Sequence, residues 1–508
     1  MTLIRTLSVT LVLGAAVSSL RADDVKPTEK KTGDTTVRIS GRTGDWHMWG
    51  GEPDRNMVSG EKNIPAKWDI KKGTNVKWVA GLGSQTYGNP VIAGGKIFVG
   101  TNNNGHLRPG IEGDKGVVLC IDEKTGKLLW QATHDKLPTG RVNDWPEQGI
   151  CSTACYSDGK VYYVSNRAEV ICADPEGMRN GNDGPYTDET YKEEMDADFI
   201  WIYDMIDELD AFPHNLATCS PVVWKNYIFV STSNGVDEGH LDLPEPDAPD
   251  FICLDKNTGK LLWEKNYTKG KVLHGQWSSP ACGVIAGKEQ VVFGAGDGWV
   301  YGLDMKTGDM IWKFDMNPKD SKWVLGGRGT RNAIIATPVI HENNVFLCVG
   351  QDPEHGEGIG HLYRIDATKT GDISESGKIW HLGGEDFKRS MSTVCIVDDL
   401  MYASDLSGFL YCLDAKTGRK YWTHDTFAAI WGSPYYVDGK VMLGTEDGEV
   451  LVFDHNKTKK LIATNDMKNS VYTSPVVANG TLYITNRNTL YAISAGAQAK
   501  PQAAARAN

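Results

Sequence analysis

One eleven-residue segment decides the fold: Cys120-Ile-Asp-Glu-Lys-Thr-Gly-Lys-Leu-Leu-Trp130. It aligns without gaps with three further segments, Cys253 to Trp263, Gly302 to Trp312 and Cys412 to Trp422. Every copy has Asp in third place, Thr-Gly in sixth and seventh, and Trp in eleventh. The Asp can hydrogen-bond the backbone of a turn, and the Gly can take a positive φ angle. Each copy therefore predicts a strand, a tight turn and a second strand whose Trp packs between neighbouring sheets.

Degenerate copies extend the repeat through the chain. A fifth copy, Asp366 to Trp380, carries an insertion in its turn, and a sixth has Thr458-Lys459 without a Trp. In the second unit Trp201 takes the place of the Trp after an acidic insertion at 175–198. Each unit begins with small polar residues, usually before a Pro: Asn89-Pro90, Ser152, Ser220-Pro221, Ser279-Pro280, Thr337-Pro338, Ser392, Ser433-Pro434 and Ser474-Pro475. Two short hairpins per unit give four strands, which we term A to D.

Eight such units predict an all-β, eight-bladed β-propeller with four antiparallel strands per blade. The last unit ends near Ser494 without its Trp strand. A matching segment lies at the other end of the chain, from Trp68 to Trp78. We therefore expect an N-terminal strand to complete the last blade and close the ring, which removes an exposed sheet edge.

Composition and termini suggest an exported protein. The net charge is −12 and no Lys/Arg-rich run is present, which argues against nucleic acid as a partner. Arg5 and the apolar stretch Leu7 to Leu20 predict a cleaved signal peptide at 1–22 rather than a membrane anchor, because the stretch is short. No lipid-attachment Cys follows it. We expect a flexible lead-in at 23–45, the propeller at 46–495, a disordered tail at 496–508, no membrane span, and a periplasmic or secreted location.

Eight of the ten cysteines recur at two equivalent points of the repeat. One point holds Cys120, Cys172, Cys253 and Cys412, and the other holds Cys155, Cys219, Cys282 and Cys395. This pattern favours small buried hydrophobes over disulfides. Cys151 and Cys155 are the one close pair that could form a bond.

The candidate site lies where the D–A loops gather. Strand A is innermost in a propeller, so residues just before each A strand converge on the axis. These loops are rich in polar and aromatic residues, which suits a polar or anionic ligand. The candidate ligand-binding residues are Gln85, Asn143, Asp144, Trp145, His214, Asn215, His274, Gln276, Trp277, Arg328, Arg331, Asn332 and Trp431. Alternatively, these polar residues only bond one another, and Trp277 and Trp431 plug the channel.

Metal and catalytic signals are weaker. Two His and three carboxylates lie within Gln351 to His361, which makes Asp352, His355, Glu357 and His361 candidate metal ligands. Their spacing matches no established zinc pattern, so a polar loop is the favoured interpretation. The serines of the Ser-Pro pairs are interpreted as strand starts rather than nucleophiles, and no catalytic residue is assigned.

The segment Cys120 to Trp130 is similar to the tryptophan-docking motif of quinoprotein alcohol dehydrogenases. Over about 68–494 the chain resembles PQQ-binding-like β-propeller repeat proteins with BamB-like repeats. This resemblance implies that pyrroloquinoline quinone (PQQ) and calcium are possible cofactors. In that case Arg328 or Arg331 would polarise the quinone, Asp144 or Asp352 would act as base, and Asn215 or Glu357 would hold calcium. The sequence has no adjacent Cys pair of the kind that covers the cofactor in those enzymes.

Two functional hypotheses result. The leading one is a binding or scaffold protein that takes a small polar ligand or a protein partner at the axis. The alternative is a PQQ- and calcium-dependent dehydrogenase of small alcohols or sugars.

Overall fold

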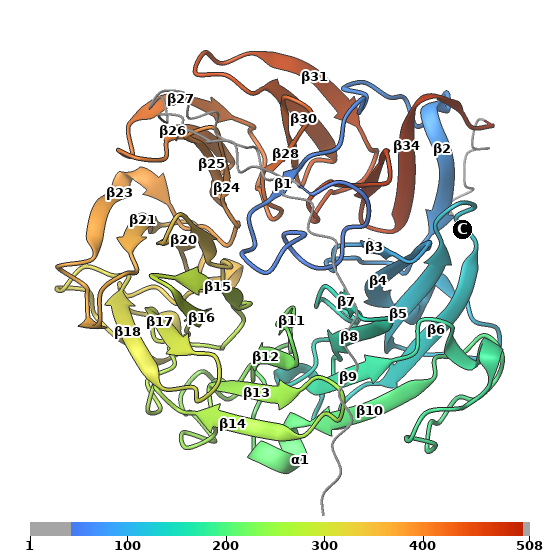
Figure 1. The fold of residues 1–508 in the computed structure, drawn as a ribbon, viewed down its shortest axis with the longest axis horizontal. Coiled ribbons are helices and arrows are strands. Elements are labelled where there is room, and N and C mark those ends of the chain that lie inside the picture. The colour runs from blue at the N-terminus through green and yellow to red at the C-terminus, as the bar shows by residue number, and fades with distance from the viewer. Residues whose placement is uncertain (1–41, 501–508) are drawn as a thin grey trace, which may run out of the picture. The chain divides into compact units, whose positions relative to one another are not determined.

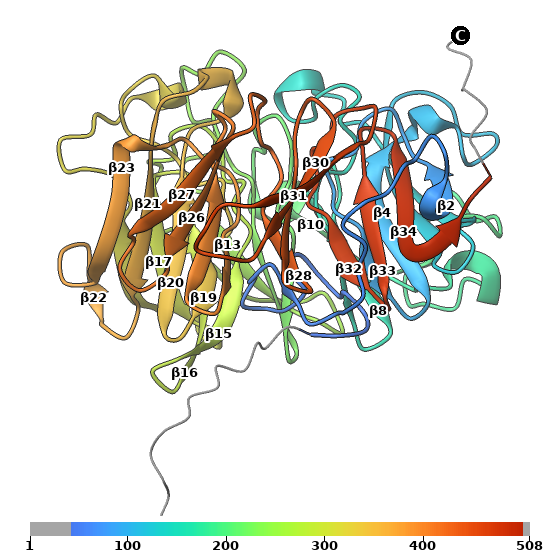
Figure 2. The same ribbon diagram turned by 90° about the horizontal axis from the view of Figure 1, so that it is seen from above.

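The structure, a computed structural model, describes residues 42–500. Eight antiparallel sheets stand around one axis, each with four strands of a blade, and two sheets carry one extra strand (Figures 1 and 2). The predicted eight-bladed propeller is therefore confirmed. The expected signal peptide, and the end of the tail from residue 501, lie outside the described residues. Among residues 42–500, no helix has the length and apolar character needed to cross a membrane.

The blades follow the chain in order. Blade 1 contains β3 (Val91–Ala93), β4 (Lys96–Asn102), β5 (Lys115–Asp122) and β6 (Leu128–Asp135). Blade 2 contains β7 (Cys155–Ser157), β8 (Lys160–Val164), β9 (Glu169–Ala173) and β10 (Phe199–Asp204), and is followed by helix α1 (Met205–Leu209). Blade 3 contains β11 (Val222–Trp224), β12 (Tyr227–Ser231), β13 (Phe251–Asp255) and β14 (Leu261–Lys265). Blade 4 contains β15 (Ala281–Ile285), β16 (Lys288–Gly294), β17 (Trp299–Asp304) and β18 (Met310–Asp315).

The second half of the ring repeats the pattern. Blade 5 contains β19 (Val339–His341), β20 (Asn344–Val349), β21 (Ile359–Asp366) and β23 (Lys378–Lys388), and β22 (Gly371–Asp372) joins the edge of blade 4. Blade 6 contains β24 (Cys395–Val397), β25 (Leu400–Ser404), β26 (Phe409–Asp414) and β27 (Lys420–Asp425). Blade 7 contains β28 (Tyr435–Val437), β29 (Lys440–Gly444), β30 (Glu449–Asp454) and β31 (Leu461–Asp466), with β1 (Val58–Ser59) on its inner edge. Blade 8 contains β32 (Val476–Ala478), β33 (Thr481–Thr485), β34 (Thr489–Gln498) and β2 (Thr74–Gly81).

The two ends of the propeller share blade 8. Strand β2 is antiparallel to β34, with Val76 opposite Ile493 and Trp78 opposite Ala492. The predicted ring closure is therefore confirmed. Strand β34 continues to Gln498, beyond the expected boundary at 495, because Thr74 pairs with that residue.

The repeated Trp joins six of the eight blades to the next one. Asp255 shows the turn chemistry, since its Oδ1 accepts hydrogen bonds from the backbone N–H and the hydroxyl of Thr258, both at 2.9 Å. Gly259 in this turn has φ of 70°, and a Cβ there would lie 2.5 Å from the Trp201 ring. The indole N–H groups of six Trp residues donate to a backbone carbonyl of the next blade at 2.9 to 3.2 Å: Trp78, Trp130, Trp201, Trp263, Trp380 and Trp422.

Blade 4 departs from this rule. Trp312 is fully buried, but its indole N–H donates within its own blade to Gln290 Oε1 at 2.9 Å. The insertion in the turn of the fifth copy forms β22, which pairs in parallel with β18 and places Gly371 opposite Trp312. The inserted strand β22 thus lies beside Trp312, in the position where the Asp-Thr-Gly turn of the next blade lies beside Trp201.

The N-terminal segment 42–64 lines the inner edge of the ring, where it crosses the axis in Figure 1. An innermost A strand has one edge without a neighbouring strand of its own blade. Six of these edges are bonded by this segment, through backbone or side-chain atoms of Trp46, His47, Pro53, Asp54, Asn56 and Met57. Arg55 has no exposed surface and donates to the carbonyls of Trp49, Ser220, Pro221 and Pro280 at 2.7 to 3.1 Å. The segment therefore closes one end of the channel.

The cysteines are unpaired, and all except Cys151 are buried. They pack within the hydrophobic cores of the blades, as Cys155, Cys172 and Cys253 do in one cluster and Cys395 and Cys412 in another.

Candidate functional site

A girdle of small polar residues surrounds the axis where the A strands begin. In six places the backbone N–H of one blade donates to a side-chain oxygen of the adjacent blade. The bonds are Asn89 to Thr153, Thr153 to Ser220, Ser220 to Ser279, Thr393 to Ser433, Ser433 to Ser474, and Ser474 to Asn89, at 2.7 to 3.2 Å. The recurring Ser-Pro pairs thus fasten neighbouring blades together. Hydroxyl oxygens used as acceptors still carry a hydrogen for a further bond.

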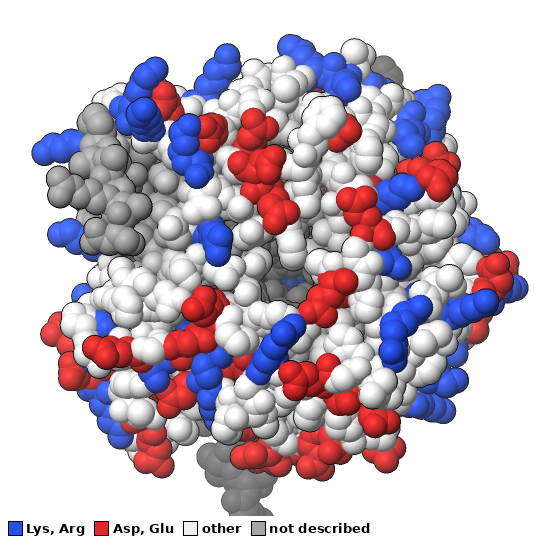
Figure 3. All heavy atoms as spheres, turned by 180° about the vertical axis from the view of Figure 1, so that it is seen from behind, with Lys and Arg blue, Asp and Glu red and all other residues white. Residues whose placement is uncertain are grey.

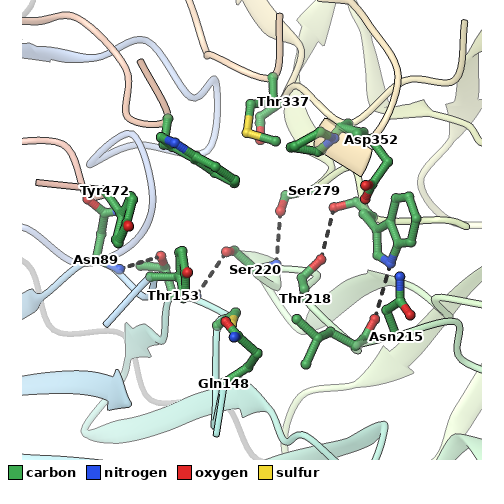
Figure 4. Close-up of a pocket in the computed structure, with 18 of the residues that line it drawn as sticks. Asn89, Gln148, Thr153, Asn215, Thr218, Ser220, Ser279, Thr337, Asp352 and Tyr472 are labelled. Carbon is green, nitrogen blue, oxygen red and sulfur yellow. Dashed lines mark hydrogen bonds between the residues drawn. The ribbon is translucent and has the colours of Figure 1, made fainter. Parts of the chain in front are cut away.

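A cavity of about 440 Å³ lies above this girdle. The face opposite the N-terminal segment is hollowed at the axis (Figure 3). Asn89, Thr153, Ser220, Ser279 and Thr337 line the cavity, and Figure 4 shows the bonds between the first four. Trp49 of the N-terminal segment also lines it, and its indole N–H donates to Thr393 Oγ1 at 3.2 Å. The cavity is therefore a pocket closed at one end, rather than an open channel.

Aromatic rings form much of the wall. Tyr87 stacks on Tyr472 with ring centroids 4.9 Å apart, and Trp431 packs edge-on against Tyr472 at 5.5 Å. Trp145 and Trp277 also line the cavity. The Trp277 ring is held by its N–H, which lies 3.2 Å from the carbonyls of both His214 and Leu216. Fixed aromatic faces beside hydroxyl groups suit a ligand with a flat or apolar surface and a few polar groups.

The charged groups of the wall are acidic. Asp352 and Glu354 line the cavity, and none of the described lining residues is Lys or Arg. Burial raises the pKa of Asp352 to about 6, and the neighbouring Glu354 adds to the effect. At the mouth, Arg141 stacks over the Trp145 ring at 3.9 Å and its guanidinium lies 3.9 Å from the Glu354 carboxylate. The charged side chains of the lining are therefore acidic, whereas the sequence suggested arginines at this place.

Four of the predicted ligand-binding residues line the cavity: Trp145, Asn215, Trp277 and Trp431. Three others are buried behind its wall and make structural bonds. Asn143 donates to the Pro213 carbonyl, Asp144 pairs with Lys136, and Gln276 donates to Asp250. Gln85 accepts a bond from the Tyr87 hydroxyl at 3.0 Å and so supports a lining residue.

The predicted arginines do not line the cavity. Arg331 forms an ion pair with Asp315 at 2.6 Å and donates to the Asp297 carbonyl at 2.7 Å. Arg328 is exposed and donates to the His240 carbonyl at 3.0 Å. Asn332 is buried and bonds the Ile359 carbonyl and Arg389. These side chains are held away from the pocket by partners that the sequence did not indicate.

The predicted histidines form a separate cluster beside Trp277. His214 and His274 lie next to each other with ring centroids 4.5 Å apart, and His240 and His355 join them. The other candidate metal ligands do not meet there. His361 lies 3.0 Å from His381, Glu357 is exposed, and Asp352 accepts a bond from the backbone N–H of Glu354.

Sequence reasoning missed Trp49, and it placed Tyr87 and Tyr472 in the D–A loops without choosing them as ligand-binding residues. Trp49 belongs to a segment outside the repeats, so no periodic pattern pointed to it. Tyr87 and Tyr472, by contrast, precede the starts Asn89-Pro90 and Ser474-Pro475 by two residues each. That shared spacing was a signal for the aromatic wall. The small polar starts themselves were visible but were interpreted as strand starts only.

Comparison with known proteins agrees with this architecture. A family model described as outer membrane protein assembly factor BamB matches residues 114–179, 221–424 and 360–461, which together exceed half of the chain. The chain belongs to this family of PQQ-like β-propellers. BamB from Moraxella catarrhalis has the same fold, with a TM-score of 0.54 at 15% identity over 82% of this chain and 99% of that one. A europium-containing methanol dehydrogenase gives a TM-score of 0.58 at 13% identity, over 91% of this chain and 100% of the other.

Curated relatives match over a shorter stretch. The quinoprotein alcohol dehydrogenase PedE of Pseudomonas putida is 27% identical over 129 residues, which is 25% of this chain and 17% of the relative. A quinoprotein ethanol dehydrogenase of Pseudomonas putida is 26% identical over the same length. The match thus covers about a sixth of each relative's length.

The family raises the question of whether the pocket fits PQQ. This cofactor is a flat molecule with three carboxylates, so a matching site needs cationic or N–H donors. The described wall offers two carboxylates and no Lys or Arg, and Arg331 is committed to Asp315. Cys151 lines the pocket as a single thiol. The amides of Asn89, Gln148 and Asn215 can donate N–H bonds, but no Lys or Arg among the described lining residues can pair with a carboxylate, so the lining does not fit a tricarboxylate.

Proposed function

We propose that this chain is a non-catalytic binding propeller that takes a small uncharged or cationic ligand into the axial pocket. One observation carries the proposal: a cavity of about 440 Å³ that is closed by Trp49 at its base and walled by aromatic rings and hydroxyl groups. A volume of this order is typical of small-molecule sites. The same chemistry fits a side chain presented by a protein partner.

The empty volume of the axial pocket supports a ligand-binding role over the alternative that Trp277 and Trp431 only fill the channel. The N-terminal segment already fills the inner edge of the ring, and Arg55 is fully buried there. If Trp277 and Trp431 served only to fill the channel, no cavity would be needed between them. An apolar wall with a few convergent polar groups is instead the arrangement expected for a ligand site.

A PQQ- and calcium-dependent dehydrogenase remains the second candidate, supported by the local match to two quinoprotein dehydrogenases. The acidic wall argues against it, because an anionic cofactor and two lining carboxylates would repel each other. We therefore keep the binding role as the conclusion and use PQQ as a probe in its test.

A fluorescence and thermal-shift assay tests the proposal. The purified protein is titrated with neutral sugars, with aromatic ammonium compounds, and with PQQ plus Ca²⁺. We expect a compound of the first two classes to bind, and Trp277→Ala to weaken that binding about tenfold or more, because the ring loses its stacking surface. Trp299→Ala, in β17 and outside the cavity lining, is the matched control.

Two outcomes would contradict the proposal. Tight PQQ binding with reduction of a dye in the presence of alcohols would establish the dehydrogenase. If Trp277→Ala and Trp299→Ala changed the affinity for every ligand equally, the axial pocket would not be the binding site.

A further inference from the structure

We propose that His214, His240 and His274 bind a divalent late transition-metal ion of the Zn²⁺ class, with the neighbouring His355 as a fourth ligand after a movement of its side chain. The site lies beside the axial pocket, and the proposal does not depend on what that pocket binds. Imidazole nitrogens are ligands suited to Zn²⁺, Cu²⁺ and Ni²⁺, whereas Ca²⁺ prefers oxygen ligands.

The distances match a metal site. The candidate ligand nitrogens of His214, His240 and His274 all lie within 4.8 Å of one another. His240 Nε2 and His274 Nε2 are 3.3 Å apart. Two nitrogens bound to one tetrahedral Zn²⁺ at about 2.0 to 2.1 Å are separated by about 3.3 to 3.4 Å. Small side-chain shifts would therefore suffice to place all three around an ion.

His214 is oriented as a ligand. Its Nδ1 lies 2.7 Å from the Val236 carbonyl, which can only accept, so Nδ1 carries the hydrogen. The lone pair is then on Nε2, which is buried and has no hydrogen-bond partner. The side chain itself is only 1% exposed. A bond from the second ring nitrogen to a backbone carbonyl is a common feature of metal-binding histidines.

Two neighbouring histidines also have unpartnered nitrogens. His274 has no exposed surface, and its Nδ1 is buried without a partner. His355 Nε2 is likewise buried and unpartnered, and its ring centroid lies 5.1 Å from that of His274. An orphaned buried polar atom is destabilising and calls for a partner. An ion held by His240 Nε2 and His274 Nε2 would satisfy His214 Nε2, and His355 Nε2 if that ring moves in as a fourth ligand, whereas His274 Nδ1 would keep no partner.

The ligands come from four connections of the ring. His214 lies between β10 and β11, His240 between β12 and β13, His274 between β14 and β15, and His355 between β20 and β21. An ion here would therefore tie together the loops of blades 2 to 5. The charges around the cluster are mixed: Asp237 lies near His214 and His240, whereas His355 has Arg389 and Arg328 as well as Glu354 beside it.

The cluster also supports the pocket wall. The rings of His274 and Trp277 lie 5.0 Å apart, and the Trp277 indole N–H donates to the His214 carbonyl. Metal binding would thus stiffen one wall of the axial pocket from behind.

Calorimetry with Zn²⁺ on the chelator-treated protein tests the site, and the visible spectrum of Co²⁺ reports tetrahedral nitrogen ligation. We expect one equivalent of Zn²⁺ to bind and to raise the melting temperature. Loss of a residue that only orients a metal ligand typically weakens metal binding by about 10- to 100-fold. Loss of a ligand should weaken it at least as much, so we expect His214→Ala or His274→Ala to weaken Zn²⁺ binding by about 100-fold or more. His424→Ala, in β27, is the control and should leave the affinity unchanged.

His240→Asn is a second variant that separates loss of metal binding from loss of folding, because the His240 side chain is only half-buried. It should weaken Zn²⁺ binding while the metal-free protein melts at the wild-type temperature. The proposal would be overturned if Zn²⁺ failed to bind, if it bound equally well to His274→Ala and His240→Asn, or if His424→Ala alone weakened it.

Discussion

At the scale of single residues, Asp54 illustrates how burial makes stability depend on pH. Burial raises the pKa of its carboxyl to about 6, and its backbone carbonyl accepts a bond from the Ile340 N–H. The folded state therefore holds a proton that the unfolded chain releases near pH 4.

We expect the free energy of unfolding to fall as pH rises from about 4 to about 6, because the folded protein must then bury a charge. The loss contributed by Asp54 is at most about 1.4 kcal/mol per pH unit within that window. Asp54→Asn should remove this contribution, and the exposed Asp320→Asn should not. Urea unfolding at several pH values measures both, and identical pH slopes for Asp54→Asn and the wild type would refute the assignment.

At the scale of one element, the N-terminal segment 42–64 acts as an inner strand for most of the ring. Arg55 anchors it through four backbone carbonyls from three parts of the chain. The Arg55 side chain has no exposed surface, and bonds donated by a charged group are stronger than bonds between neutral groups.

Arg55→Met should loosen this segment and destabilise the fold by about 3 kcal/mol or more, because four buried carbonyls lose their partner. Hydrogen exchange measures the effect at single backbone amides. The Cys282 and Ile340 amides, which donate to the carbonyls of Pro53 and Asp54, should exchange faster. The Cys253 amide in the middle of blade 3 provides the internal control, and an equal change at all three amides would contradict a local anchor.

At the scale of the whole molecule, β2 makes the ring a closed structure. Trp78 belongs to β2 of blade 8 and bonds the Glu123 carbonyl of blade 1, as Trp422 of blade 6 bonds Asn456 of blade 7. Both side chains are 8% exposed. The closing contact therefore has the same form as a contact inside the ring.

We expect Trp78→Ala and Trp422→Ala to lower the free energy of unfolding by similar amounts, about 3 to 5 kcal/mol each. If the ring unfolds as one unit, both variants keep a single transition by circular dichroism and by tryptophan fluorescence. A separate early transition found only in Trp78→Ala would show that the closing blade opens independently.

The sequence by itself determined the repeat, the number of blades and the closure. Each depends on short-range chemistry, such as Asp255 capping its own turn and Trp201 reaching the adjacent blade. The starts of the A strands also located the axis. Trp277 and Trp431, two residues before such starts, line the pocket, and so do Trp145 and Asn215, which lie further back in the same kind of loop.

Only the tertiary structure decided the rest. Arg331 is drawn to Asp315, and His240, from a loop without a repeat motif, meets His214 and His274. The path of residues 42–64 across the axis follows no periodic pattern. The physical reason is that local turns and strand alternation repeat along the chain, whereas ion pairs, buried histidines and a non-repeating segment find their partners only when distant residues are brought together.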